Sequence, residues 1–159
     1  MSARILVAGV GNIFLGDDGF GCEVVRRLAS RPLPPRCEVV DFGIRGLHLA
    51  HALLTPCDLL VLVDAVHREE PPGTVYLLAP NTGAVPHSPG AAHGMDLPAV
   101  FASVRALGGS VPRTLLVACE PLDLADGIGL SEPVEQAVGE AVRRVEELVR
   151  REAFVAATA

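Results

Sequence analysis

A glycine-rich stretch near the amino terminus constrains the fold more than any other part of this chain. It runs from Gly9 to Gly21 and has the sequence GVGNIFLGDDGFG. An apolar run precedes it, and apolar residues at helical spacing follow it. Glycines allow the positive φ values and the close backbone approach that a tight crossover needs. The stretch, called the glycine-rich turn below, is therefore predicted to connect a strand to a helix.

Further apolar runs and amphipathic segments alternate along the rest of the chain, which predicts a mostly parallel sheet with helices on both faces. The connection at Pro71–Gly73 is too short for a crossover, so the strand after it is expected to be an antiparallel edge strand. We expect one three-layer α/β/α domain over residues 1–152, with about five strands, and a frayed tail over residues 153–159. The predicted strands cover 4–9, 38–42, 59–63, 74–78 and 114–118, and the predicted helices 20–28, 47–54, 97–107 and the segment from Ser131.

The bulk composition excludes several classes of protein. The net charge is −6, and all thirteen basic residues are scattered arginines, whereas a nucleic-acid binder needs a basic face. The sequence contains no run that could cross a bilayer and no secretory signal, so we expect a cytoplasmic protein. The four cysteines are far apart in the sequence, which is typical of buried thiols rather than of zinc ligands or disulfides.

Acidic residues follow several of the predicted strands. In parallel sheets, ligands bind beyond the carboxyl ends of the strands. This rule places the glycine-rich turn, Asp41, Asp64 and Glu120 along one edge of the sheet. Asp17 and Asp18 could instead cap the helix that follows them, because the amino end of a helix favours carboxylates.

A metal site is one chemistry that this edge could support. Asp18 and Asp64 follow strands that should be neighbours, and an imidazole could complete the set. Two carboxylates and one imidazole suit a divalent ion such as Ni(II), Zn(II) or Fe(II) and leave open positions. His87 and His93 are the candidates, because both lie in the long segment from Pro80 to Gly94, which shows no helical or strand periodicity.

Two other chemistries fit the sequence less well. A dinucleotide site is suggested by Gly9 and Gly11 after the first strand and by Asp41 after the second. However, Phe14 occupies the place of the third glycine, and the adjacent acids would repel a pyrophosphate. A serine nucleophile would need a Gly-x-Ser-x-Gly elbow, which the sequence lacks.

The glycine-rich turn resembles the amino-terminal signature of the nickel–iron hydrogenase maturation endopeptidases. The resemblance continues in order through Asp41–Gly46, Leu60–Ala65, Pro72–Thr74, the region of His93, Glu120–Pro121 and Gly127–Ser131. It thus covers nearly the whole chain, and the family fold is a single α/β/α domain.

The resemblance implies an endopeptidase that removes the C-terminal extension of a hydrogenase large-subunit precursor after nickel insertion. The nickel-contacting positions of the family fall on Asp18, Asp64 and His93, with His87 as the alternative imidazole. We expect the nickel to be that of the precursor rather than a resident ion. A non-catalytic metal-binding assembly factor and a nucleotide-binding enzyme are the alternatives.

Three further residues are candidates for substrate binding. Asn12 could contact substrate or hold the turn through its own backbone. Asp41 and Arg45 could contact the C-terminal segment of the substrate, or form an exposed salt link. Glu120 could support the site or simply end its strand.

Overall fold

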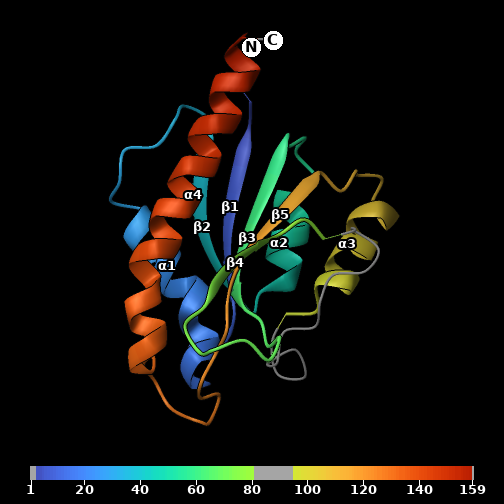
Figure 1. The fold of residues 1–159 in the computed structure, drawn as a ribbon. Coiled ribbons are helices and arrows are strands. Elements are labelled where there is room, and N and C mark those ends of the chain that lie inside the picture. The colour runs from blue at the N-terminus through green and yellow to red at the C-terminus, as the bar shows by residue number, and fades with distance from the viewer. Residues whose placement is uncertain (1–2, 81–94, 159) are drawn as a thin grey trace.

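The computed structural model of the chain describes residues 3–80 and 95–158. A five-stranded sheet in the order β2-β1-β3-β5-β4 forms its centre (Figure 1). The strands are β1 (Ile5–Val10), β2 (Cys37–Gly43), β3 (Leu59–Ala65), β4 (Val75–Leu78) and β5 (Arg113–Cys119). The helices are η1, a 3₁₀ turn (Gly16–Gly19), α1 (Phe20–Leu28), α2 (Gly46–Ala52), α3 (Leu97–Ala106) and α4 (Glu132–Thr158).

Strand directions confirm the predicted fold class. β1 pairs in parallel with β2 and with β3, and β3 pairs in parallel with β5. β4 is the antiparallel edge strand, with Val75 opposite Cys119. The connection through Pro71–Gly73 is too short to return the chain to the other end of the sheet, so β4 has to reverse direction.

Helices cover both faces of the sheet, as the alternating pattern predicts. Figure 1 shows α1 and α4 on one side of the sheet and α2 and α3 on the other. Alternate residues of a strand point to opposite faces, so Ile5 and Val7 of β1 enter the core under α1 and α4. Leu6 and Ala8 enter the core under α2 and α3. Every residue of β1 and β3 is buried, which explains their continuous apolar character.

α1 packs unusually close to the sheet because its first turn contains Gly21. A β-carbon at this position would lie 2.0 Å from the carbonyl oxygen of Val63 and 2.6 Å from that of Val10. Only glycine therefore lets the helix approach the carboxyl ends of β1 and β3 this closely.

Most element boundaries differ by one or two residues from the predicted ones, and two of the differences matter for the argument. β3 extends through Asp64 to Ala65, so Asp64 lies inside the strand rather than after it. α4 continues to Thr158, although the sequence analysis expects a frayed tail from residue 153. No glycine or proline interrupts this alanine-rich segment, and Ala156 packs against the core, which keeps the last turns helical.

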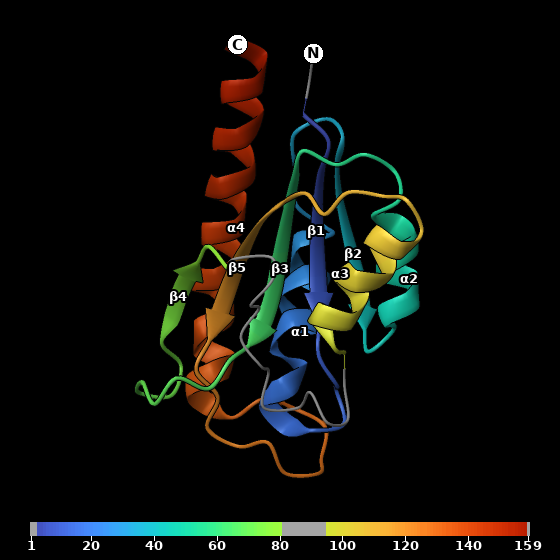
Figure 2. The ribbon, with the colours of Figure 1, turned by 90° about the vertical axis from the view of Figure 1, so that its right-hand side faces the viewer.

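The carboxyl ends of the parallel strands gather the segments that carry chemistry. In Figure 2, β1, β3 and β5 point toward the bottom of the view, where the 120–131 loop passes. No helix in the described ranges is long and apolar enough to span a membrane.

Candidate functional site

The candidate site lies at the carboxyl ends of β1 and β3, where the strand order reverses. β1 lies between β2 and β3, so the connections after β1 and β3 leave the sheet in different directions. Such a switch point is where open α/β sheets bind ligands. The glycine-rich turn follows β1 here, and Asp64 is the second-last residue of β3.

Gly11 lets the main chain of Asp18 lie close to the carboxylate of Asp64, the two predicted metal-contacting residues. Its φ is +133°, and a β-carbon here would lie 1.9 Å from the carbonyl oxygen of Asp18 and 3.5 Å from Oδ1 of Asp64. Glycine is therefore required for the turn to fold back against the end of β3. The side chains of Asp18 and Asp64 are 1% and 3% exposed.

Main-chain hydrogen bonds orient both carboxylates. The N–H of Asn12 donates to Oδ2 of Asp18 at 2.7 Å. The N–H of Ala65 donates to Oδ1 of Asp64 at 2.8 Å. The backbone of the glycine-rich turn thus binds an acid of its own chain, whereas a phosphate cradle would offer such N–H groups to a ligand. This arrangement disfavours the dinucleotide interpretation.

A third carboxylate, Asp41, lies at the same place, and the thiol of Cys22 lies among all three. The thiol is buried and donates to the carbonyl oxygen of Gly11 at 3.7 Å. Burial raises the pKa of Cys22, and the negative charges of Asp41, Asp64 and Asp18 raise it further. The thiol therefore stays protonated at neutral pH and is a poor nucleophile.

The sequence predicts a buried thiol at Cys22 but gives no reason to place it in the site. One sequence feature could have placed Cys22 in the site. It lies in the first turn of the helix after the glycine-rich turn, where a side chain can face back toward the edge of the sheet. That signal is weak, because most residues at such positions only fill the core.

Asp17 has a different role from its neighbour. Its carboxylate is fully buried and accepts hydrogen bonds from the N–H groups of Leu122, Asp123 and Ser131 at 2.7 to 2.9 Å, and from the hydroxyl of Ser131 at 2.7 Å. α1 begins after Gly19 without a side-chain cap. Asp17 thus binds the 121–131 loop and the start of α4, and the alternative that it caps α1 is wrong.

Glu120 ties the loop after β3 to β4 and β5. It is 1% exposed, and Nδ1 of His67 lies 2.9 Å from its Oε1. The N–H of Arg68 donates to its Oε2 at 2.8 Å, and the hydroxyl of Tyr76 approaches the same oxygen at 3.4 Å. These contacts favour a structural role at the end of β5.

The other predicted residues also make local contacts. Oδ1 of Asn12 accepts the N–H of Phe14 at 2.9 Å, which holds the turn. The guanidinium of Arg45 donates to the carbonyl oxygens of Asp41 and Phe42, so it fastens the turn after β2. No salt link joins Asp41 and Arg45 in the described part of the chain. Contact of Asn12, Asp41 or Arg45 with substrate stays a prediction.

The predicted third ligand cannot be placed. His93 and the alternative His87 lie outside the described residues. Within residues 3–80 and 95–158, no three His, Cys, Asp or Glu side chains form a group that could hold a metal ion. The described part of the site therefore consists of acidic residues, and the contribution of an imidazole stays a prediction.

The fold and this site define an α/β enzyme with acidic groups at the switch point, and comparisons with known proteins identify its family. The HycI family model, described as hydrogenase maturation protease, matches residues 22–148. The chain belongs to the hydrogenase maturation protease family, whose members are endopeptidases.

Individual relatives agree along most of the chain. It is 34% identical to the hydrogenase 2 maturation protease of Escherichia coli over 148 residues, covering 89% of this chain and 88% of that protein. It is 32% identical to the hydrogenase expression/formation protein HupD of Rhodobacter capsulatus, covering 89% of this chain and 71% of that protein. The solved structure of the maturating endopeptidase HybD from Escherichia coli superposes with a TM-score of 0.78 at 32% identity, covering 93% of each chain.

Proposed function

We propose that this protein removes the C-terminal extension of a nickel–iron hydrogenase large-subunit precursor after nickel has been inserted. Family membership supports an endopeptidase. The observation that carries the proposal for the site is the position of two buried acids, Asp18 and Asp64, at the switch point of the sheet, where the charges of both reach the thiol of Cys22.

The chemistry of these groups supports a substrate that brings its own metal. Carboxylates crowded together in a buried place repel one another, and a divalent cation relieves that repulsion. Asp18 and Asp64 provide only two ligands, which is a weak and open set for a resident ion. In our proposal they contact the nickel of the precursor, with His93 as the third ligand.

Hydrolysis then needs an activated water and a polarised carbonyl. Nickel next to the scissile bond can polarise the carbonyl oxygen, and a carboxylate of the site can take a proton from the attacking water. Water adds to the carbonyl carbon, the C–N bond breaks, and the proton passes to the leaving amine. The products are the mature subunit with a new carboxylate and a free peptide. The protonated thiol of Cys22 takes no part as a nucleophile.

Incubation with a nickel-loaded precursor tests this proposal. Mass spectrometry should show loss of the extension with the wild-type protein and not with a nickel-free precursor. Asp18→Ala, Asp64→Ala and His93→Ala should each lower the rate by about 100-fold or more, because each removes a group that orients the reacting centre. The matched control is Asp126→Asn, which changes an exposed acid outside the site.

Three outcomes would contradict the proposal. Near wild-type cleavage by Asp64→Ala would remove that residue from the site. Binding of the precursor without any cleavage would indicate an assembly factor. Tight binding of a nucleotide by the purified protein would favour the nucleotide-binding alternative.

A further inference from the structure

A groove of about 540 Å³ lies between α1 and β2, and Cys22 and Asp41 of the site line part of it. Its volume is within the usual range for ligand pockets. Cys22 and Asp41 line it where it meets the site, and Val25, Ala29 and Val39 line it further along. The groove therefore adjoins the site through Cys22 and Asp41.

The edge of β2 offers main-chain hydrogen-bonding groups along this groove. Within the described residues, β2 pairs only with β1, so its other edge has no strand beside it. The N–H of Ile5 donates to the carbonyl oxygen of Arg36 at 3.0 Å. This hydrogen bond determines which main-chain groups of β2 point toward β1. Main-chain groups of successive residues point to opposite edges of a strand. The N–H and C=O of Val39 and the N–H of Asp41 therefore point away from β1. The carbonyl oxygen of Asp41 is already bound by Arg45.

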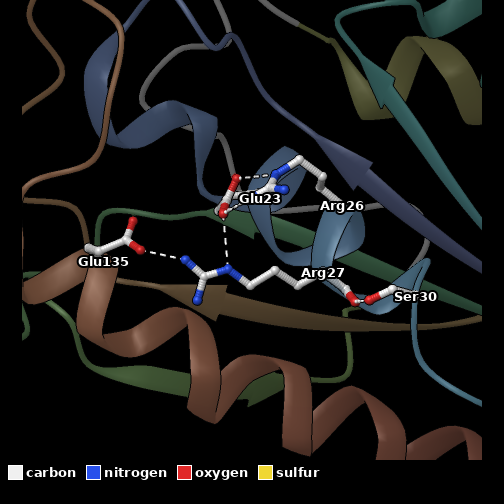
Figure 3. A network of polar contacts seen from close by, with 5 residues as sticks. All are labelled: Glu23, Arg26, Arg27, Ser30 and Glu135. Carbon is white, nitrogen blue, oxygen red and sulfur yellow. Dashed lines mark hydrogen bonds and ion pairs between the residues drawn. The ribbon is translucent and has the colours of Figure 1, made fainter.

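Charged side chains beside the groove are paired with one another. Figure 3 shows Arg27 of α1 between Glu23 of the same helix and Glu135 of α4. Arg26 binds Glu23 at 2.6 Å. These ion pairs join α1 to the start of α4, and Asp41 adds a negative charge to the lining of the groove. A slightly acidic, largely apolar groove does not attract an anion such as a nucleotide.

The remaining wall is apolar and belongs to the 121–131 loop. Ile128 and Leu130 line the groove opposite β2, and Ile128 is 77% exposed. Exposed apolar side chains next to a site commonly mark a surface that a protein partner covers. An apolar groove with a free strand edge is the arrangement that binds an extended peptide by strand addition.

We propose that this groove holds the C-terminal extension of the precursor, which adds to the free edge of β2 as an extra strand. The inference rests on the proposed function and deepens it by assigning the surface that recognises the substrate. Main-chain bonds to Val39 and Asp41 provide binding, and the apolar walls accept alternate side chains. The extension is the occupant because a chain end, tethered on one side only, can enter a narrow groove without threading.

The direction of β2 leads such a peptide to the carboxylates. β2 runs parallel to β1, and the N–H of Gly11 donates to the carbonyl oxygen of Gly43 at 3.0 Å. The carboxyl end of β2 thus touches the glycine-rich turn that contains Asp18. A peptide paired with β2 has one end at the site, and binding through its main chain makes recognition tolerant of its sequence.

A substitution that fills the far end of the groove tests the inference. Ala29 is exposed and follows α1, about 14 Å along the helix from Phe20. Ala29→Trp should raise KM for the nickel-loaded precursor about tenfold with little change in kcat, because it obstructs the extension and not the reacting groups. Ser30→Trp is the matched control, since Ser30 is the exposed neighbour that does not line the groove.

Hydrogen exchange gives a second measurement that does not depend on cleavage. A synthetic peptide with the sequence of the extension, at ten times its Kd, should slow exchange of the Val39 and Asp41 amides about tenfold. The amides of β4, at the other edge of the sheet, should be unchanged.

The outcomes separate this inference from the proposed function. If the wild type cleaves the precursor, an unchanged KM for Ala29→Trp together with unprotected β2 amides would overturn the inference alone. If the wild type cleaves no nickel-loaded precursor, the proposed function fails, and protection of β2 by the peptide would still support a peptide-binding groove.

Discussion

Asp17 and Asp18 are adjacent in the sequence but have different roles in the structure. The 3₁₀ turn that contains them directs the two side chains to different surroundings. The carboxylate of Asp18 accepts the N–H of Asn12 in the glycine-rich turn, whereas that of Asp17 accepts hydrogen bonds from the 121–131 loop. The sequence predicts two acids at the edge of the sheet. Only the path of the 121–131 loop determines which of the two binds that loop.

Asp17→Asn should destabilise the protein by about 3 kcal/mol. The carboxylate accepts four hydrogen bonds, and an amide would point its own N–H₂ group at some of these donors. Urea unfolding measures the change in free energy. Asp126→Asn is the control, because Asp126 is an exposed acid of the same loop; an equal loss in both variants would contradict the anchoring role.

The contribution of Asp17 should also depend on pH. Burial alone would raise the pKa of its carboxyl, but hydrogen bonds from Asp123, Ser131 and Leu122 outweigh it and hold the pKa below its ordinary value of 3.8. A carboxyl group whose pKa is lower in the folded than in the unfolded state stabilises the folded protein at pH values above the unfolded-state pKa. This stabilisation is lost as the pH falls through the folded-state pKa. The stability difference between wild type and Asp17→Asn should therefore be constant above about pH 5 and shrink below about pH 4.

Strands and helices were predicted well where the apolar run, or the segment with apolar residues at helical spacing, was long. All five strands and four main helices occur where the sequence places them, with boundary shifts of a few residues. The main exception is the end of α4, which the sequence leaves without a clear stop signal. The sequence also contains no sign that Gly21 contacts β1 and β3, because that contact depends on how α1 lies on the sheet.

Gly21→Ala should destabilise the fold by about 3 kcal/mol. The added methyl group would lie 2.0 Å from the carbonyl oxygen of Val63, so α1 would have to move away from the sheet. Gly139→Ala is the matched control: its methyl group would approach only the end of the Arg143 side chain, at 3.5 Å. In α4 this change should stabilise by about 1 kcal/mol.

Thermal unfolding of the two glycine variants measures both effects. The melting temperature should fall for Gly21→Ala and rise for Gly139→Ala. A fall of similar size in both would mean that helix propensity, and not the approach of α1 to the sheet, governs the Gly21 position.

At the scale of the whole molecule, all four cysteines are free thiols, as the sequence predicts. Cys22 and Cys119 are buried, while Cys37 and Cys57 are only partly so, which corrects the expectation of burial for the latter pair. Burial is the main cause that raises the pKa of each thiol, to about 12 for Cys119 and about 11 for Cys37.

The native protein should accordingly react slowly with a disulfide reagent such as DTNB. A rise of two pKa units lowers the fraction of reactive thiolate about 100-fold. All four thiols should react rapidly in concentrated guanidinium chloride, and the absorbance of the released product follows both reactions. Rapid reaction of Cys22 or Cys119 in the folded protein would contradict the burial of these two thiols.

The sequence by itself determined the layers of this protein, the order and type of its elements and the edge where its acids gather. These features follow from the local periodicity of apolar residues and from the rule that parallel strands have their carboxyl ends at the same edge of the sheet. They can therefore be predicted without knowledge of tertiary contacts. Tertiary structure alone decided that the main chain of Asp18 and the carboxylate of Asp64 meet beside Gly11, that Cys22 lies near three carboxylates, and that a groove lies between α1 and β2. Each of these depends on how segments distant in sequence pack together, and no local pattern carries that information.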